Sequence, residues 1–170
     1  MPSRDEFIKE VGDFLAKSKS LGGIGLPVQW QPNRDPAELC IKLPIELEGV
    51  VSAQRLIVVY SPASEALRFS ILIVYRVAVC RMDFDETGGH TNGFGNLEGL
   101  PMTIQGSHFH RWSNNIRFVK GNGQLEELDN AEPIPIAIRT FDAALRWFCD
   151  EAKIALPHNH NIALPAKVLI

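Results

Sequence analysis

Apolar residues recur at helical spacing near the start of the chain. Between residues 7 and 15, apolar side chains return every three or four positions, which is typical of a helix with one buried face. Ser3 and Glu6 precede this run at the spacing of a capping box, in which each side chain satisfies a backbone N–H of the first helical turn. The pattern predicts a helix that begins after Ser3 and ends before Gly22.

The pattern then changes to that of β-strands. Val, Ile, Leu and aromatic residues dominate four segments separated by Pro, Gly and Ser, at residues 28–31, 38–48, 54–60 and 67–84. The last segment is long enough for two strands. A glycine-rich loop follows at residues 88–99, and two further short strands are predicted at residues 103–112 and 116–120.

A second helical pattern occurs late in the chain. Thr140 has the character of an N-cap, and the apolar residues from Phe141 onward line one helix face before Pro157. The order of helix, strands and helix predicts an α+β fold with a single domain over residues 1–170. We expect an antiparallel sheet of about five to seven strands, with the N-terminal and C-terminal helices packed on one face.

The amino-acid composition indicates the general class of protein but no particular function. Of the 170 residues, 45% are hydrophobic and 22% are charged, which is the balance of an ordinary globular protein. The formal net charge of −3 gives no overall basic field for binding nucleic acid. A local basic face is still compatible with this total, because several arginines lie in the middle of the chain.

The number of cysteines and the hydropathy of the chain indicate the cellular compartment in which the protein resides. Three widely spaced cysteines, Cys40, Cys80 and Cys149, argue against a disulfide scaffold or a structural zinc finger and fit a reducing environment. The charged, periodic start differs from a signal peptide, and the longest apolar stretch is too short to span a bilayer. We therefore expect a cytoplasmic protein with no membrane partner.

The most informative short motif is the sequence GSHFHRW at residues 106–112. In a strand, alternate residues share a face, so His108 and His110 project together while Phe109 and Arg111 point the other way. Two imidazoles on one face make this strand a candidate for a catalytic or binding site.

An upstream strand repeats this alternation with charged residues. In the sequence RMDFD, Arg81, Asp83 and Asp85 share one face, and Met82 and Phe84 share the other. If the apolar set faces the core, we expect both polar sets to lie on the outer, solvent-facing side of one sheet.

The glycine-rich loop between the two strands adds two more polar candidates. His90 and Asn92 lie in the sequence GGHTNG, whose glycines permit a close approach of the backbone. We expect these two side chains to fold back over the polar face.

Such a cluster suits three kinds of chemistry. Two histidines with a third ligand match the three-ligand pattern of a catalytic zinc or related metal. Histidines beside an arginine could instead act as acid and base on a phosphodiester. The third possibility is a contact patch that binds a protein or nucleic-acid partner without catalysing a reaction. The alternative without function is also open, because histidines and aspartates are common on exposed strand faces.

The polar run, from Arg81-x-Asp-x-Asp through Gly89-His-x-Asn92 and Leu100-Pro-x-Thr-Ile104 to His108-x-His-Arg-Trp112, resembles small bacterial proteins related to the TumE-type toxins of toxin–antitoxin modules. The resemblance covers residues 75–155, including the late helix. Where that family usually has Pro-Asp-Gly after His-x-Asn, this chain has Gly93-Phe-Gly95. The resemblance implies a mobile-element or defence-related setting and a growth-inhibiting activity on RNA or nucleotides.

These observations lead to a first hypothesis, a toxin–antitoxin or phage-defence protein that acts on RNA or a nucleotide phosphate. The expected catalytic residues are His108, His110, His90 and Asp83, and the expected substrate-binding residues are Arg81, Arg111 and Asn92. No metal ligand is assigned, and the cofactor is left open. A cognate antitoxin, a host defence complex, RNA or a nucleotide is the expected partner.

Two alternatives belong to other classes. One is a non-enzymatic inhibitor, either antitoxin-like or a phage-encoded anti-defence protein, and the other is a metal-binding domain. Whether the protein is an enzyme stays open at this level.

Overall fold

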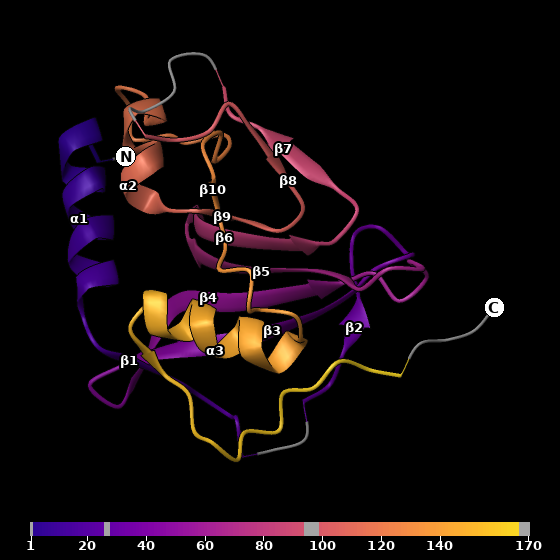
Figure 1. The fold of residues 1–170 in the computed structure, drawn as a ribbon. Coiled ribbons are helices and arrows are strands. Elements are labelled where there is room, and N and C mark those ends of the chain that lie inside the picture. Colours follow the sequence, from indigo (N-terminus) through magenta and orange to yellow (C-terminus); the bar gives the residue numbers. More distant parts are fainter. Residues whose placement is uncertain (1, 26–27, 94–98, 167–170) are drawn as a thin grey trace.

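The computed structural model of the chain describes residues 2–25, 28–93 and 99–166. It has the predicted α+β architecture, with a helix at each end of the sequence and a large, mostly antiparallel sheet between them (Figure 1). The helices are α1 (Arg4–Ala16), α2 (Trp112–Asn115), the 3₁₀ turn η1 (Ile116–Phe118) and α3 (Phe141–Glu151).

The main sheet has nine strands, more than the five to seven expected. They are β1 (Lys19–Leu21), β2 (Gln31–Pro32), β3 (Leu39–Leu47), β4 (Val50–Tyr60), β5 (Arg68–Tyr75), β6 (Val77–Asp85), β9 (His108–His110), β10 (Glu132–Pro133) and β11 (Ile154–Ala155). The strands that the sequence did not reveal, β1, β10 and β11, have only two or three residues, which is too short to show a period of two. The spatial order is β10-β9-β6-β5-β4-β3-β1-β11, with β2 paired to β3 and a parallel pair between β1 and β11.

The predicted N-terminal cap is confirmed. The Glu6 carboxylate accepts hydrogen bonds from the Ser3 backbone N–H at 2.8 Å and from the Ser3 hydroxyl at 2.9 Å, and the Ser3 hydroxyl accepts from the Glu6 N–H. The other end of α1 is capped by the buried Lys19, whose ammonium donates to the carbonyl oxygens of Phe14, Leu15 and Lys17. These caps fix α1 against the sheet.

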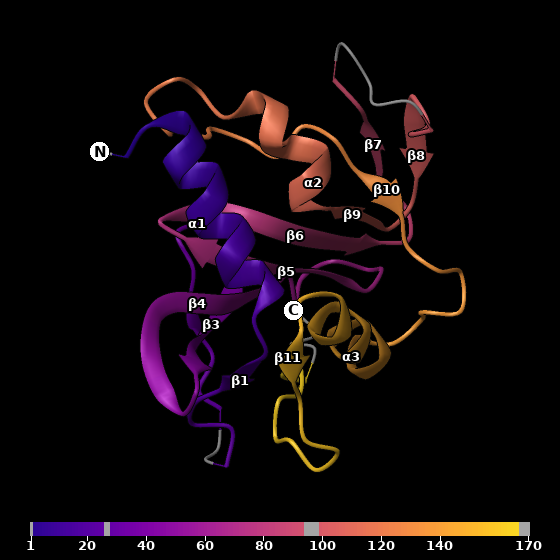
Figure 2. The same ribbon diagram turned by 90° about the vertical axis from the view of Figure 1, so that its left-hand side faces the viewer.

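One face of the sheet forms the main core beneath the helices. Residues that are opposite one another on four strands are all buried, namely Val58, Ile71, Met82 and Phe109. The ring of Phe109 packs edge to face against Trp147 and Phe148 of α3, at centroid distances of 5.1 and 5.9 Å. In the two views of Figures 1 and 2, α3 lies on one side of β6, and a separate hairpin lies on the other.

That hairpin consists of β7 (Gly89–Thr91) and β8 (Thr103–Gln105) and forms a sheet of its own. It is built from the segment predicted as a glycine-rich loop and the start of a strand. The long apolar stretch at residues 67–84 forms two strands as predicted, and the chain turns between them at Arg76 with a φ of 63°. The hairpin is the element that shapes the candidate site.

The strand predicted at residues 116–120 is wrong. After β9 the chain forms α2 and then η1, because Arg111 takes an extended conformation and the following residues turn at once into helix.

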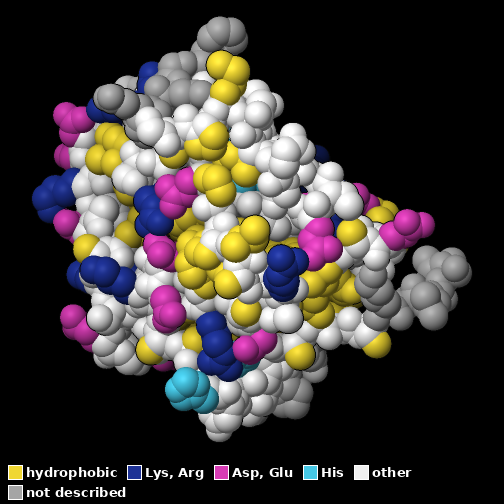
Figure 3. Space-filling model, viewed as in Figure 1, with side chains coloured by type: hydrophobic (Ala, Val, Ile, Leu, Met, Phe, Trp, Pro, Cys, Tyr) yellow, Lys and Arg dark blue, Asp and Glu magenta, His cyan; other side chains and the backbone are white. Residues whose placement is uncertain are grey.

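None of the helices in the described part of the chain has the length and apolar character needed to span a bilayer. In the view of Figure 3, Lys and Arg side chains are scattered among acidic and apolar ones and form no continuous basic field.

Candidate functional site

Strands β6 and β9 carry the site, and their pairing brings the two predicted polar sets together. The antiparallel register places Arg81 opposite His110 and Asp83 opposite His108. Met82 lies opposite Phe109 on the other face, in the core. The alternation in both strands is therefore as expected from the sequence.

The expectation that this polar face lies open to solvent is wrong. Only 6% of His108 and 0% of His110 is exposed. The β7–β8 hairpin folds over the face and brings His90 onto the two strand histidines, as the loop glycines suggested. The Nε2–H of His90 donates to the carbonyl oxygen of Asp129 at 2.8 Å, which ties the hairpin to the segment before β10.

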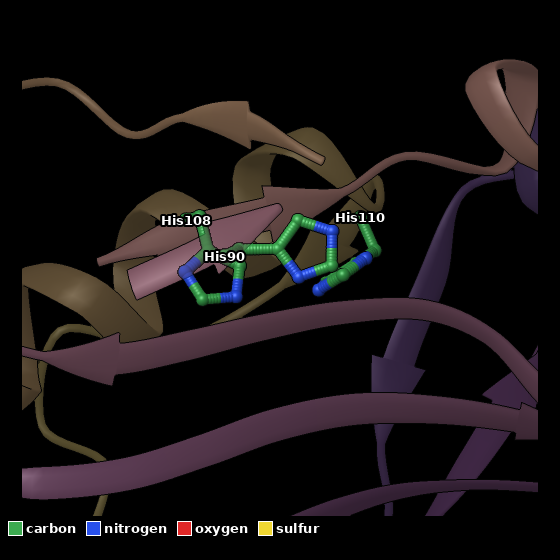
Figure 4. A group of neighbouring side chains, drawn as sticks. All are labelled: His90, His108 and His110. Carbon is green, nitrogen blue, oxygen red and sulfur yellow. The ribbon is translucent and has the colours of Figure 1, made fainter. Parts of the chain in front are cut away.

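The three imidazoles form a compact group (Figure 4). Their ring centroids are 5.0 Å apart for His90 and His108, 4.8 Å for His90 and His110, and 5.1 Å for His108 and His110. One ring nitrogen from each residue lies within 4.8 Å of the other two. Three residues from two separate sheets therefore converge on one point.

Asp83 lies beside the histidines and is the electrostatic centre of the site. Its Oδ2 is 2.8 Å from Arg81 Nε, 3.4 Å from His108 Nε2 and 3.3 Å from His110 Nε2, while its Oδ1 accepts from the Ser70 hydroxyl at 2.6 Å. Burial raises the pKa of this carboxyl, but the two histidines, Arg81 and Ser70 more than offset that effect. The pKa of Asp83 is therefore held far below its ordinary value, and the residue is ionised.

The pKa values of the two strand histidines are shifted in opposite directions. Burial lowers the pKa of both rings. For His108, the hydrogen bonds with Asp83 and with the Gly106 carbonyl outweigh burial, so its pKa is raised. For His110, deeper burial and the positive charge of Arg81 prevail over Asp83, so its pKa is lowered. The site thus holds one imidazole that favours the charged form and one that favours the neutral form.

A pocket of about 420 Å³ opens beside these groups. It is lined by Arg68, Ser70, Arg81, Asp83, Asp85, His90 and His108, with Phe69, Phe84, Gly88 and Gly89. Arg68 did not emerge from the sequence, because nothing in its local context marks it. The signal is the register of β5 and β6, which places Arg68 directly opposite Asp85.

Two other predicted site residues lie elsewhere. The Asn92 side chain holds the backbone together: its amide donates to the Pro101 and Ala131 carbonyls, and its oxygen accepts from the Ala131 N–H. It is buried and anchors the base of the hairpin.

Arg111 is on the opposite side of β9, as its place in the alternation indicated. Its guanidinium forms ion pairs with Glu132 at 2.8 Å and Glu151 at 2.7 Å, and it lies over the Phe109 ring. The structure therefore brings together Arg81, Asp83, His90, His108 and His110, but not Asn92 or Arg111.

Comparisons with known proteins give no family assignment: no protein-family model, curated protein or solved structure matches the chain. The chemistry of the site has to be inferred from its own geometry.

Proposed function

We propose that the protein acts on a phosphate-bearing substrate, RNA or a nucleotide, in the pocket beside the three histidines. The observation that carries the proposal is the presence of two guanidinium groups, Arg68 and Arg81, in the same pocket as His90 and His108. Guanidinium N–H groups match the geometry and charge of phosphate oxygens.

Each arginine is held from one side by an aspartate. Arg81 Nε lies 2.8 Å from Asp83 Oδ2, and Arg68 Nε lies 3.4 Å from Asp85 Oδ2. These contacts use Nε, so the terminal nitrogens of Arg68 are not committed to its aspartate. The Arg68 side chain is 63% exposed, which makes it accessible to a ligand entering from solvent.

The histidines supply the reactive groups of the proposed site. An imidazole beside a bound phosphate can transfer protons or hold a metal ion. The hydrogen bonds that orient the rings of His90 and His108 favour the second role.

The biological setting is also part of the proposal. A toxin–antitoxin or phage-defence context, with a cytoplasmic location and a cognate antitoxin or host complex as partner, rests on the family resemblance of residues 75–155. The pocket chemistry is compatible with that setting, since a growth-inhibiting activity on RNA or nucleotides requires recognition of phosphate.

The test measures binding and turnover of a short single-stranded RNA and of ATP in low salt, with zinc or manganese supplied. We expect binding of at least one of them, and a loss of roughly tenfold in affinity for Arg68→Gln, as for one charge-assisted hydrogen bond. Arg34→Gln, at an exposed arginine outside the pocket, is the matched control and should leave affinity unchanged. Absence of binding to both ligands, or equal affinity for the Arg68 variant, would overturn the proposal.

A further inference from the structure

Hydrogen bonds to backbone carbonyls fix which nitrogen of two histidines is available. A carbonyl oxygen can only accept, so the ring nitrogen facing it must carry the proton. His90 uses Nε2–H on the Asp129 carbonyl at 2.8 Å, and His108 uses Nδ1–H on the Gly106 carbonyl at 3.0 Å. This leaves Nδ1 of His90 and Nε2 of His108 facing the centre of the group. The Nε2 of His108 donates to Asp83 in the metal-free protein and has to release its proton when it binds a metal ion.

His110 presents its Nε2 to the same region. The Nη2 of Arg81 donates toward this nitrogen at 3.1 Å, so Nε2 offers its lone pair and Nδ1 carries the proton. Among the described residues, the buried His110 Nδ1 has no hydrogen-bond partner.

We propose that His90, His108 and His110 bind one divalent transition metal ion of the zinc type, with the Asp83 carboxylate completing the site. This inference deepens the proposed function, because it names the group that acts on the phosphate. Its geometric basis is the separation of the donor atoms. Zinc–ligand bonds of about 2.0–2.1 Å in a tetrahedron separate neighbouring ligand atoms by roughly 3.4 Å.

The carboxylate and the strand histidines already have this spacing. Asp83 Oδ2 lies 3.4 Å from His108 Nε2 and 3.3 Å from His110 Nε2. The histidine nitrogens lie within 4.8 Å of one another, so closing the site needs movements of up to about 1.4 Å. His90 is on the β7–β8 hairpin, which forms a sheet of its own and can supply part of that movement.

The surroundings of two of the three rings match those of metal-binding histidines. Such histidines usually donate their second N–H to a carbonyl or carboxylate, which fixes the tautomer and orients the ring. The carbonyls of Asp129 and Gly106 do this for His90 and His108. Three nitrogen donors favour zinc and related transition metals over magnesium and calcium, which prefer oxygen donors.

In the metal-free protein, the Arg81 guanidinium provides the positive charge that the metal ion would otherwise provide. Its guanidinium contacts both His110 Nε2 and Asp83 Oδ2, which are two of the atoms that would bind the ion. Metal binding must therefore displace Arg81 from these atoms. The released guanidinium remains in the pocket, where it can bind phosphate, and a phosphate oxygen can join the ion as a fifth ligand and be polarised.

The first test titrates zinc and cobalt(II) into metal-depleted, untagged protein, with metal content measured after dialysis. We expect one ion per chain and, for cobalt, the visible absorption of a tetrahedral site. His90→Ala should lower affinity by more than about 100-fold, since losing a ligand costs more than losing a partner of a ligand. His158→Ala, at an exposed histidine in the tail, should bind as the wild type does.

Two results would overturn the inference: less than a stoichiometric amount of metal on the wild type, or unchanged affinity for a folded His90→Ala protein, with folding checked by circular dichroism. If His90→Ala fails to fold, Arg81→Met supplies the second variant. It should bind zinc more tightly, because the competing cation is gone, and a weaker affinity contradicts the displacement of Arg81.

The metal titration contains no phosphate ligand, so it tests the metal site independently of the proposed phosphate-binding function. Zinc binding without affinity for RNA or ATP overturns the proposed function alone. Binding of RNA or ATP in the presence of a chelator, together with absent zinc binding, overturns the metal site alone.

Discussion

The two faces of strands β6 and β9 are both covered by other elements, one of them completely and the other in part. On one face, Met82 and Phe109 pack among apolar side chains beneath α3, where removal from water is favourable by itself. On the other, Asp83, His108 and His110 lie beneath a two-stranded hairpin, where burial of polar groups costs free energy unless each is paired.

The difference shows which face serves the fold. Replacing a buried ion pair by well-packed apolar residues is often neutral or stabilising, so stability alone does not require the polar face. The hairpin nevertheless covers it, and His90 adds a third imidazole to it. The apolar face therefore accounts for the stability of the fold, and the binding role proposed above gives a reason for the polar face.

The largest effect on stability is expected on the apolar face. Phe109→Ala should lower the free energy of unfolding by about 3–5 kcal/mol, because it leaves a cavity between the sheet and α3. Urea denaturation measures this loss. Ile136→Ala, at a side chain that is 86% exposed, is the control and should change little. A loss below about 1 kcal/mol for Phe109→Ala would show that this face is not the main core.

On the polar face, Asp83→Asn should be the most damaging substitution in the metal-free protein. It removes the negative charge that faces Arg81, His108 and His110, and we expect a loss of about 2–3 kcal/mol, somewhat less than for a fully buried pair because Asp83 is 22% exposed. The same urea titration checks it. An unchanged or increased stability would mean that the polar network is not held together by this carboxylate.

The stability contributed by Asp83 should depend on pH. Its pKa in the folded protein lies far below the ordinary value of 3.8, so the folded state favours the ionised form. The contribution is complete above about pH 5 and is lost progressively as the pH falls below it, since the unfolded chain then takes up the proton first. The stability difference between wild type and Asp83→Asn should therefore shrink from pH 6 to pH 3, and a constant difference would contradict the assignment.

Asn92→Ala should have a smaller effect on global stability and a local effect on the hairpin. The substitution removes the amide that bridges Pro101 and Ala131, and we expect a loss of about 2 kcal/mol. Hydrogen exchange should then be faster in β7 and β8 and unchanged in β4 and β5. Equal acceleration in all four strands would show that the hairpin is not an independent unit.

Arg111→Met should have the smallest effect. The guanidinium is 37% exposed and pairs with Glu132 and Glu151, so its loss should cost about 1 kcal/mol. Affinity for RNA, ATP or zinc should stay as in the wild type, in contrast to Arg68→Gln. A loss of RNA or ATP affinity in the Arg111 variant would move the phosphate site to the other face.

The sequence predicted those parts of the site that depend on local periodicity. The face shared by His108 and His110, and that shared by Arg81 and Asp83, follow from strand alternation, and their meeting follows once β6 and β9 pair. The position of His90 over this face was expected from the glycine-rich loop. The burial of His108 and His110 could not be predicted, because it depends on a contact between His90 and Asp129, 39 residues apart.

Register and partner choice explain the other differences. Arg68 belongs to the pocket only because β5 pairs with β6 so that it faces Asp85, and register is set by the whole sheet. Arg111 has the same residue type as Arg81, but Glu132 and Glu151 occupy its guanidinium. A sequence shows which side chains are available and leaves open which of them are already paired.

X-ray absorption at the zinc edge of the zinc-loaded protein reports the donor atoms around the ion and so tests the three-histidine site itself. We expect three imidazole nitrogens and one oxygen at about 2.0–2.1 Å, with the scattering pattern of histidine rings, and one fewer imidazole in His90→Ala. A shell of oxygen atoms without imidazole scattering would contradict a metal centre at His90, His108 and His110.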